Sequence, residues 1–307
     1  MDYVVQTRNL TKTFQGHDVV SNVTMNIRQG EIYGFLGQNG AGKSTIMKML
    51  TNMIKPSHGE ITIFGKPLKH DSFDYLKRIG SMIEYPIFYE KMTARENLEL
   101  HCAYMGYHSK QAIRDALDRV GLENVENKLP KDFSLGMRQR LSVARAIITK
   151  PEFLILDEPI NGLDPAGIKA MRKLFKMLNQ EYGMTLLLSS HIIGEIEQIA
   201  DTIGVIKGGK LIEEASMDSI KASNTEYIEL VTSNQRKAAM VLYDKLDINN
   251  FKVIDDQTIR IYDTEVPQSS ISKTLILEDI NIESIDKKQT TLEEYFIKKV
   301  ELDQVVS

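Results

Sequence analysis

The stretch Gly37-Gln38-Asn39-Gly40-Ala41-Gly42-Lys43-Ser44 follows an apolar run, Glu31–Leu36, and precedes a segment with helical periodicity. It fits the pattern G-x-x-x-x-G-K-[ST], in which glycines let backbone N–H groups surround a phosphate where a side chain would collide. The apolar face of the following helix is expected to contain Ile46, Met49, Leu50 and Met53. A tight turn is the simpler interpretation, but a strand before and a helix after are the context that phosphate binding requires. The stretch therefore predicts a nucleotide-binding loop.

Each residue type in this loop has a physical role. Lys43 supplies a point charge to the terminal phosphates, and the Ser44 hydroxyl can ligate Mg²⁺. The helix that follows directs the positive end of its dipole at the same anion. The nucleotide contacts are expected from Gly37, Asn39, Gly40, Gly42, Lys43, Ser44 and Thr45.

Two carboxylates, Asp157 and Glu158, end the apolar run Phe153–Leu156. Ligands of parallel sheets bind beyond the carboxyl ends of the strands. Asp157 would hold Mg²⁺, directly or through water, and Glu158 would orient and polarise the attacking water. A solvated strand end is the alternative, but the phosphate loop upstream favours a catalytic pair.

The order of elements predicts an α/β fold with a P-loop NTPase core. Apolar strands that alternate with helices indicate a parallel sheet covered on both faces. An antiparallel β subdomain is expected near the N-terminus, and the helical periodicity of about 90–150 predicts an inserted helical subdomain. Strands are expected at Tyr3–Thr7, Ser21–Ile27, Glu31–Leu36, Ile61–Phe64, Phe153–Leu156 and Thr185–Leu188, a helix around Met171–Tyr182, and a hairpin through Gly208-Gly209.

The character of the sequence changes after about residue 215, so the expected domains are 1–215 and 216–307. The second domain is predicted to be a small α+β unit of the order β-α-β-β-α-β, a split βαβ arrangement. Its elements are expected at Tyr227–Val231, Gln235–Lys245, Phe251–Ile254, Thr258–Tyr262, Ser269–Glu278 and Ile282–Asp286. A last helix is expected to begin at Thr291, with Glu294 completing a capping box.

Composition restricts the classes of function. The 307 residues carry a net charge of −4 and no basic stripe, which disfavours a nucleic-acid partner. A single cysteine, Cys102, suits a reducing compartment. The N-terminus lacks the pattern of a signal peptide, and no apolar stretch approaches the ~20 residues that span a bilayer. A membrane connection is therefore expected to go through a partner protein.

The segment Phe133-Ser134-Leu135-Gly136-Met137-Arg138-Gln139-Arg140 stands ahead of a predicted helix and the acidic strand. Here the chain resembles the ATPase subunits of ABC transporters, over roughly the first 215 residues. Phe133–Met137 is similar to the family signature Leu-Ser-Gly-Gly-Gln. Ser134 and Gly136 are kept, whereas Leu135 and Met137 replace a glycine and the glutamine.

Further positions of the resemblance occur in the family's order. Phe14 corresponds to an aromatic ring that stacks on adenine, and Asp164, within Asn161-Gly162-Leu163-Asp164, to an acidic residue that communicates across a dimer. His191 corresponds to a histidine that contacts the γ-phosphate. Individually, Phe14 could be a core residue and His191 an ordinary polar side chain. The resemblance implies ATP as substrate, and a head-to-tail homodimer in which Ser134 and Gly136 of one copy complete the other's nucleotide site.

At two positions the chain differs from the usual pattern of the family. Ile79-Gly80-Ser81-Met82-Ile83-Glu84-Tyr85-Pro86 occupies the place of the family's glutamine loop, with Glu84 as a charged candidate ligand for Mg²⁺. Ile160 replaces a threonine, for which the sequence offers no functional reason. With Ser134–Met137 and the ending Thr291–Phe296, the chain is similar to bacitracin-resistance and lantibiotic-immunity ATPases.

This finer resemblance implies a cytoplasmic ATPase held on the inner face of the membrane by separate permease subunits. It also implies export of a peptide antibiotic, giving resistance or self-immunity. A second possibility is export of another cargo, such as sodium ions or a small drug. A translation or repair ATPase is disfavoured by the single cassette and the absence of long heptads. A small-molecule kinase would leave Phe133–Arg140 without a purpose.

Overall fold

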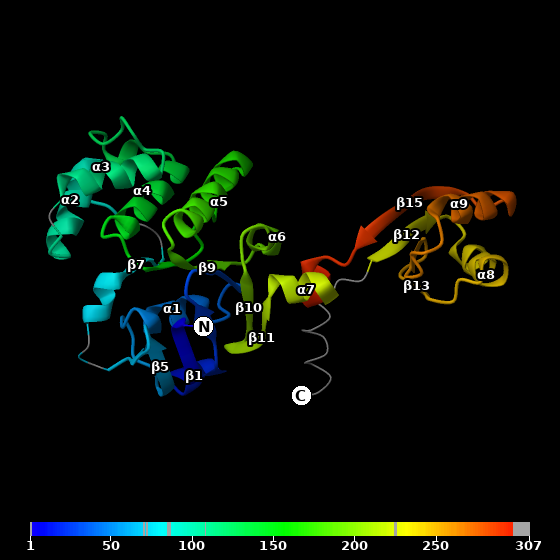
Figure 1. The fold of residues 1–307 in the computed structure, drawn as a ribbon, viewed down its shortest axis with the longest axis horizontal. Coiled ribbons are helices and arrows are strands. Elements are labelled where there is room, and N and C mark those ends of the chain that lie inside the picture. The colour runs from blue at the N-terminus through cyan, green and yellow to red at the C-terminus, as the bar shows by residue number, and fades with distance from the viewer. Residues whose placement is uncertain are drawn as a thin grey trace. The chain divides into compact units, whose positions relative to one another are not determined.

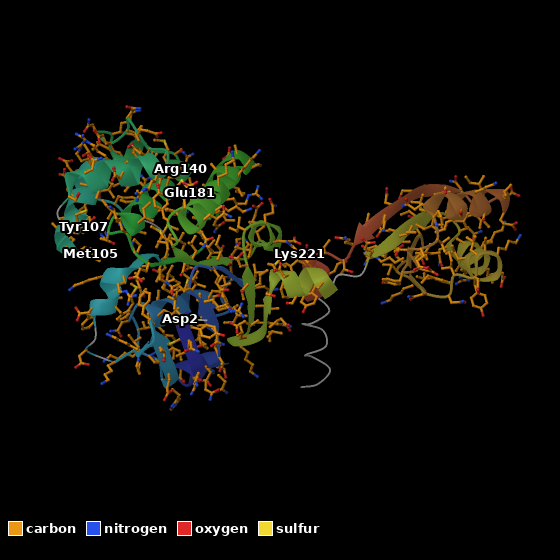
Figure 2. All side chains as sticks on the ribbon, viewed as in Figure 1. Asp2, Met105, Tyr107, Arg140, Glu181 and Lys221 are labelled. Atoms are coloured by element: carbon orange, nitrogen blue, oxygen red, sulfur yellow. The ribbon has the colours of Figure 1, made fainter. Side chains whose placement is uncertain are left out.

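The structure, a computed structural model, describes residues 2–69, 71, 73–84, 87–107, 109–223 and 226–296. It falls into two compact units that divide between Asp218 and Ser219 (Figure 1). The first unit contains two β-sheets with their helices, and the second contains a third sheet with helices that include α8 and α9. Side chains pack into separate apolar cores in these units (Figure 2). Within the described ranges, no helix is long and apolar enough to cross a bilayer.

The larger sheet of the first unit is mostly parallel. Its strand order is β11-β10-β4-β9-β8-β7, and its described strands pair in parallel except for β10 with β11. The strands are β4 (Ile32–Leu36), β7 (Ile79–Met82), β8 (Phe153–Leu156), β9 (Thr185–Ser190), β10 (Thr202–Lys207) and β11 (Lys210–Ser216). Every residue of β4, β8 and β9 is buried, as in parallel sheets covered on both faces.

The second sheet of this unit is antiparallel. Its strands are β1 (Tyr3–Phe14), β2 (His17–Val23), β3 (Asn26–Arg28), β5 (His58–Ile63) and β6 (Lys66–Pro67). The expected strand Tyr3–Thr7 is too short, because β1 continues through Asn9 despite its φ of 48°. The expected strand Ser21–Ile27 is divided, because the buried Thr7 hydroxyl donates to Val23 O at 3.0 Å and accepts from Met25 N at 2.9 Å.

Helix α1 (Lys43–Leu50) lies at the centre of the core of the first unit. Ile46, Met49 and Leu50 are fully buried among residues of both sheets, including Val5 and Phe153. The phosphate loop therefore leads directly into the most buried helix of the unit.

The placement of Met53 on the buried face of this helix is wrong. The helix ends at Leu50, where the Thr51 hydroxyl donates to Met47 O at 3.0 Å. Asn52 then adopts a left-handed conformation with φ 56°, which turns the chain. Met53 is consequently 65% exposed.

The inserted helical subdomain contains α2 (Ala94–Tyr104), α3 (Lys110–Arg119) and α4 (Leu135–Ile147). Side-chain caps start each helix: Thr93 forms a capping box with Glu96, and Ser109 and Ser134 accept hydrogen bonds from Ala112 N and Met137 N. The remaining helical segments of the first unit are η1 (Asp74–Arg78), η2 (Pro130–Asp132), α5 (Pro165–Gln180) and α6 (Ile193–Glu197); α7 (Met217–Ser223) spans the division between the units.

The second unit has the element order β-α-β-β-α-β. Its elements are β12 (Glu226–Thr232), α8 (Gln235–Leu246), β13 (Phe251–Val253), β14 (Thr258–Ile261), α9 (Gln268–Leu277) and β15 (Ile282–Gln289). The sheet order β13-β14-β12-β15 is antiparallel throughout, with a core that includes Leu230, Leu242 and Leu275. Glu294 N donates to the Thr291 hydroxyl and Thr291 N to Glu294 Oε2, at 3.2 and 3.3 Å, which forms the expected capping box. The predicted fold class is confirmed.

Gly80, in the middle of β7, lets the helical subdomain approach the parallel sheet. A Cβ at this position would lie 2.1 Å from Ala146 O on α4, a distance that backbone atoms cannot tolerate. Since Ser134 caps the N-terminus of α4, Gly80 also fixes where the signature segment lies relative to the sheet.

Gly80→Ala should lower the free energy of unfolding by about 1–3 kcal/mol, the usual cost of overpacking a core. Gly194→Ala is the matched control, because a Cβ on Gly194 in α6 would meet nothing within 4 Å. Urea denaturation monitored by circular dichroism measures both variants. Equal stability of the two variants would show that α4 does not pack against Gly80.

Candidate nucleotide-binding and hydrolysis site

Three loops with candidate site residues leave the same edge of the parallel sheet. Leu36 at the end of β4 pairs with Ser190 on β9, and Leu156 at the end of β8 pairs with Leu188. Parallel strands end at one edge. The register therefore gathers the phosphate loop, the Asp157-Glu158 pair and His191.

The glycines of the phosphate loop are required by its backbone conformation and by the chain that packs against it. Gly40 and Gly42 have φ values of 80° and 111°, which disfavour other residues. A Cβ on Gly42 would lie 3.0 Å from Val19 O, and one on Gly37 would lie 2.5 Å from Ile206 O. Asn39 and Gly40 are exposed at the tip, and Ser44 and Thr45 are half-buried in the first turn of α1.

The Lys43 ammonium lies inside this loop, and the residue is accordingly only 5% exposed. It donates to Gly37 O at 2.5 Å and to Gln38 O at 3.2 Å. It also forms an ion pair with Glu158 Oε1 at 3.2 Å. Lys43 is therefore held beside the loop carbonyls and a candidate catalytic carboxylate.

Ser189, a residue that the sequence analysis missed, forms hydrogen bonds to both Asp157 and Glu158. The buried Ser189 hydroxyl donates to Asp157 Oδ1 at 2.6 Å and accepts from Glu158 N at 2.8 Å. Glu158 has the left-handed φ of 48°, an uncommon value for a side chain of this kind. No local motif identifies Ser189, because its partners lie more than thirty residues away in the chain.

His191 completes a connected polar group. Its Nδ1 lies 2.8 Å from Glu158 Oε2, and the other Glu158 oxygen faces Lys43. The structure thus brings Lys43, Glu158 and His191 into one chain of contacts, with Asp157 attached through Ser189.

The residues present fit Mg²⁺ bound together with phosphate. Within the described ranges, no group of three or more His, Cys, Asp or Glu side chains could hold a metal alone. Nucleotide-dependent Mg²⁺ sites need few protein ligands, because phosphate and water supply the rest. A hydroxyl at Ser44 and a carboxylate at Asp157 are such a set.

Phe14 lies at the end of the β1–β2 hairpin, whose turn is formed by Gln15 and Gly16. Its ring is 45% exposed, so it is not a core residue. The Lys12 ammonium lies 4.9 Å from the ring centroid. The hairpin borders the phosphate loop through Val19, and Phe14 pairs with His17 at the turn of the same hairpin.

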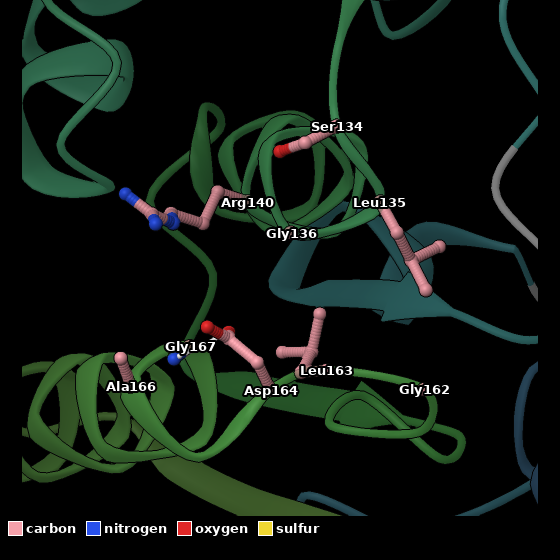
Figure 3. Close-up of a pocket in the computed structure, with 9 residues that line it drawn as sticks. All are labelled: Ser134, Leu135, Gly136, Arg140, Gly162, Leu163, Asp164, Ala166 and Gly167. Atoms are coloured by element: carbon pink, nitrogen blue, oxygen red, sulfur yellow. Dashed lines mark hydrogen bonds between the residues drawn. The ribbon is translucent and has the colours of Figure 1, made fainter.

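The signature segment faces the segment after Glu158 across a cavity of about 430 Å³ (Figure 3). Ser134 caps α4 and Asp164 caps α5, where its Oδ1 accepts from Gly167 N at 2.9 Å. Figure 3 shows Arg140 and Leu163 lining the same space, and the sequence analysis assigned a role to neither. Two helix N-termini therefore open into one cavity.

Leu135, which departs from the family signature, has a packing role. Its Cδ2 would lie 2.9 Å from a Cβ on Gly162, and Gly162 has a φ of 75°. Leu135 thus packs where the neighbouring segment carries no side chain. Ile160, the other departure, is 4% exposed and serves as a core residue.

Glu84 follows β7 and pairs with Lys48 of α1, while its own side chain remains largely exposed. Its φ of 66° turns the chain away from the strand. Tyr85 and Pro86, also part of the expected loop, lie outside the described residues. The structure places Glu84 in an ion pair on the helix that follows the phosphate loop.

A groove of about 210 Å³ lies between α1, β7 and the helical subdomain, and Met53, His101 and Met105 are among the residues that line it. Burial, and secondarily the Arg145 charge, lowers the pKa of His101. Burial likewise lowers the pKa of Arg145, whose guanidinium lies 5.0 Å from the Phe88 ring centroid. The groove is therefore lined in part by the thioether side chains of Met53 and Met105 and by the imidazole of His101, whose pKa is lowered.

Comparison with known proteins assigns this arrangement to a family. The model for "ABC transporter" matches residues 20–161. An uncharacterized ABC transporter ATP-binding protein, YcbN of Bacillus subtilis, is 63% identical over 300 residues, which cover 98% of each chain. The bacitracin transport ATP-binding protein BcrA of Bacillus licheniformis is 44% identical over 300 residues, again with 98% of each chain covered.

A solved structure agrees with these relatives. The dimeric ATP-binding cassette MJ0796, in a post-hydrolysis state with ADP and phosphate, has a TM-score of 0.64 and 28% identity. The match covers 69% of this chain and 98% of that cassette. The chain belongs to the ATP-binding proteins of ABC transporters, a family whose cassettes bind and hydrolyse ATP.

Proposed function

We propose that this ATPase powers export of a peptide antibiotic of the bacitracin or lantibiotic type through separate membrane permease subunits. One observation carries the motor part of the proposal: the phosphate loop, the Asp157-Glu158 pair and His191 converge at one edge of the parallel sheet. The identity to a bacitracin transport protein along nearly the whole chain supports the cargo class.

In this proposal the phosphates of ATP bind to the loop Gly37–Ser44. Lys43 gives up part of its contact with Glu158 to a more highly charged partner, and the N-terminus of α1 adds its dipole. Phe14 stacks on adenine from the neighbouring hairpin. Mg²⁺, held by Ser44 and Asp157 with Glu84 as a further candidate, would neutralise charge on the phosphates.

Glu158 is the proposed base that orients the attacking water. Its two carboxylate oxygens contact Lys43 and His191, and transfer of Lys43 to the phosphates would free one of them to accept a proton from water. His191 is placed to contact the γ-phosphate beside it. Asp157 is held by Ser189 and acts on the metal rather than on water.

The proposed active form is a head-to-tail homodimer. Ser134 and Gly136 stand at the N-terminus of α4, where backbone N–H groups and the helix dipole form a second anion site. Ser134 is exposed and no described side chain of the chain's own phosphate loop bonds to it. A second copy would therefore present its γ-phosphate to this site, with Asp164 at the seam, and ATP would hold the two copies together.

Glu158→Gln tests the sandwich directly. Loss of the base should slow turnover about 10²–10⁴-fold and trap the closed dimer. Size-exclusion chromatography with light scattering should show a dimer with Mg-ATP and a monomer with Mg-ADP.

The control is Glu158→Gln combined with Ser134→Arg, which fills the second phosphate site with bulk while leaving the phosphate loop intact. This double variant should bind ATP and remain monomeric. A dimer that forms equally well with Ser134→Arg present would contradict the proposed arrangement.

The groove between α1, β7 and the helical subdomain is the proposed docking site for the permease. Met53, which lines the groove, is 65% exposed, and Tyr104, the neighbour in sequence of the lining residue Met105, is 75% exposed. Exposed apolar side chains beside a groove support an interaction site there. Glu84 follows β7, whose residues line the groove, and pairs with Lys48 of α1, so docking would reach the nucleotide site through this ion pair. This docking would hold the protein on the cytoplasmic face of the membrane.

Met53→Glu should abolish the increase in ATPase rate that the permease causes, while the rate of the isolated subunit stays unchanged. Met240→Glu is the control, because Met240 on α8 is 66% exposed and Met53 is 65% exposed. ATP hydrolysis measured with and without permease in lipid nanodiscs distinguishes them. Equal effects of the two substitutions would argue against this groove.

The cargo is tested in cells that carry the chain with its permease. Deleting the chain should lower the inhibitory concentration of bacitracin or of a lantibiotic several-fold, and Lys43→Ala should fail to restore it. An unchanged response to these peptides, with altered tolerance of sodium ions or a small drug, would instead assign another cargo to the same motor.

A further inference from the structure

Ser189 connects the two carboxylates of the candidate hydrolysis site, although it belongs to neither motif. It is the penultimate residue of β9, is fully buried, and lies beside the end of β8. Its hydroxyl bonds to the side chain of Asp157 and to the backbone of Glu158, at 2.6 and 2.8 Å.

The direction of both hydrogen bonds is determined by chemistry. A backbone N–H can only donate, so the Ser189 hydroxyl must accept from Glu158 N. Its single proton is then free for Asp157 Oδ1, and an ionised carboxylate can only accept. The Ser189 hydroxyl thus bonds to Asp157 and Glu158 at once, and substitution by alanine would remove both hydrogen bonds.

These bonds fix two different features of the site. The bond to Asp157 sets the orientation of the carboxylate that is proposed to act on the metal. The bond to Glu158 N holds a backbone with φ 48°, from which the Glu158 side chain reaches Lys43 at 3.2 Å and His191 at 2.8 Å. A hydroxyl in one buried position therefore orients the Asp157 carboxylate and holds the backbone that carries the Glu158 carboxylate.

We propose that Ser189 is a positioning residue for ATP hydrolysis, acting through Asp157 and Glu158 without touching the nucleotide. This inference rests on the proposed roles of those two residues. Groups that orient metal-binding and catalytic side chains typically contribute 10–100-fold to metal affinity or activity. Loss of the hydroxyl should therefore affect turnover and the use of Mg²⁺ more than the binding of ATP.

Ser190 provides a matched control within the same strand. It is also a fully buried serine, but its hydroxyl accepts from Ile192 N at 2.9 Å and bonds to neither carboxylate. Ser189→Thr is the rescue variant, since it keeps the hydroxyl. Ser189→Ala and Ser190→Ala remove the same atom from two adjacent, fully buried positions of β9, so a general loss of stability should affect them alike.

The experiment measures kcat, KM for ATP and the Mg²⁺ concentration for half-maximal ATPase rate with the full chain, and ATP affinity without Mg²⁺. Ser189→Ala should lower kcat about 10–100-fold and raise the Mg²⁺ requirement, with ATP affinity nearly unchanged. Ser189→Thr should recover most of the rate, and Ser190→Ala should stay within a few-fold of the parent.

A parent-like rate and Mg²⁺ requirement in Ser189→Ala would overturn the inference, and so would equal losses in Ser189→Ala and Ser190→Ala. If Ser189→Ala fails to fold, Ser189→Thr decides, because a Thr variant that folds without recovering the rate would also overturn it. Glu158→Gln is measured in parallel. A parent-like rate in that variant would contradict the proposed function itself, whatever Ser189 does.

Discussion

Leu36 pairs with Ser190 and Leu156 pairs with Leu188, so β4, β9 and β8 run parallel and end together. This register depends on strands that are buried on both faces, because a parallel sheet without covering layers would expose apolar residues on each side. Helix α1 provides much of that cover and begins at the phosphate loop. The same burial that stabilises the sheet therefore also assembles the residues of the site.

The electrostatics of the site follow from this placement. Lys43 is nearly buried, and a buried cation requires compensation. Glu158 and two loop carbonyls provide it, and His191 occupies the second Glu158 oxygen. A triphosphate would compete with Glu158 for Lys43. Nucleotide binding and the freedom of the proposed base are thus linked through one ammonium group.

The sequence predicted the features that depend on neighbouring residues. The strand Phe153–Leu156 was predicted at both ends, since it is an uninterrupted apolar run that stops at Asp157. Met53 was misplaced because periodicity cannot register the left-handed turn at Asn52. Ser189 was missed for another reason: its partners are brought to it by strand register, and serines in buried strands carry no signal of their own. Leu135 was likewise noted in the sequence only as a difference from the family signature, because its packing against Gly162 depends on the fold.

The contact of Leu135 with Gly162 gives a packing reason for the leucine that stands where the family signature has a glycine. The φ of 75° at Gly162 favours glycine there, and a Cβ at this position would lie 2.9 Å from Leu135 Cδ2, so the end of the leucine side chain would have to shift. Gly162 lies between Glu158 and Asp164 on one short stretch that starts at the end of β8. Leu135 therefore packs the N-terminus of α4 against the stretch that follows Asp157 and Glu158, within a single chain.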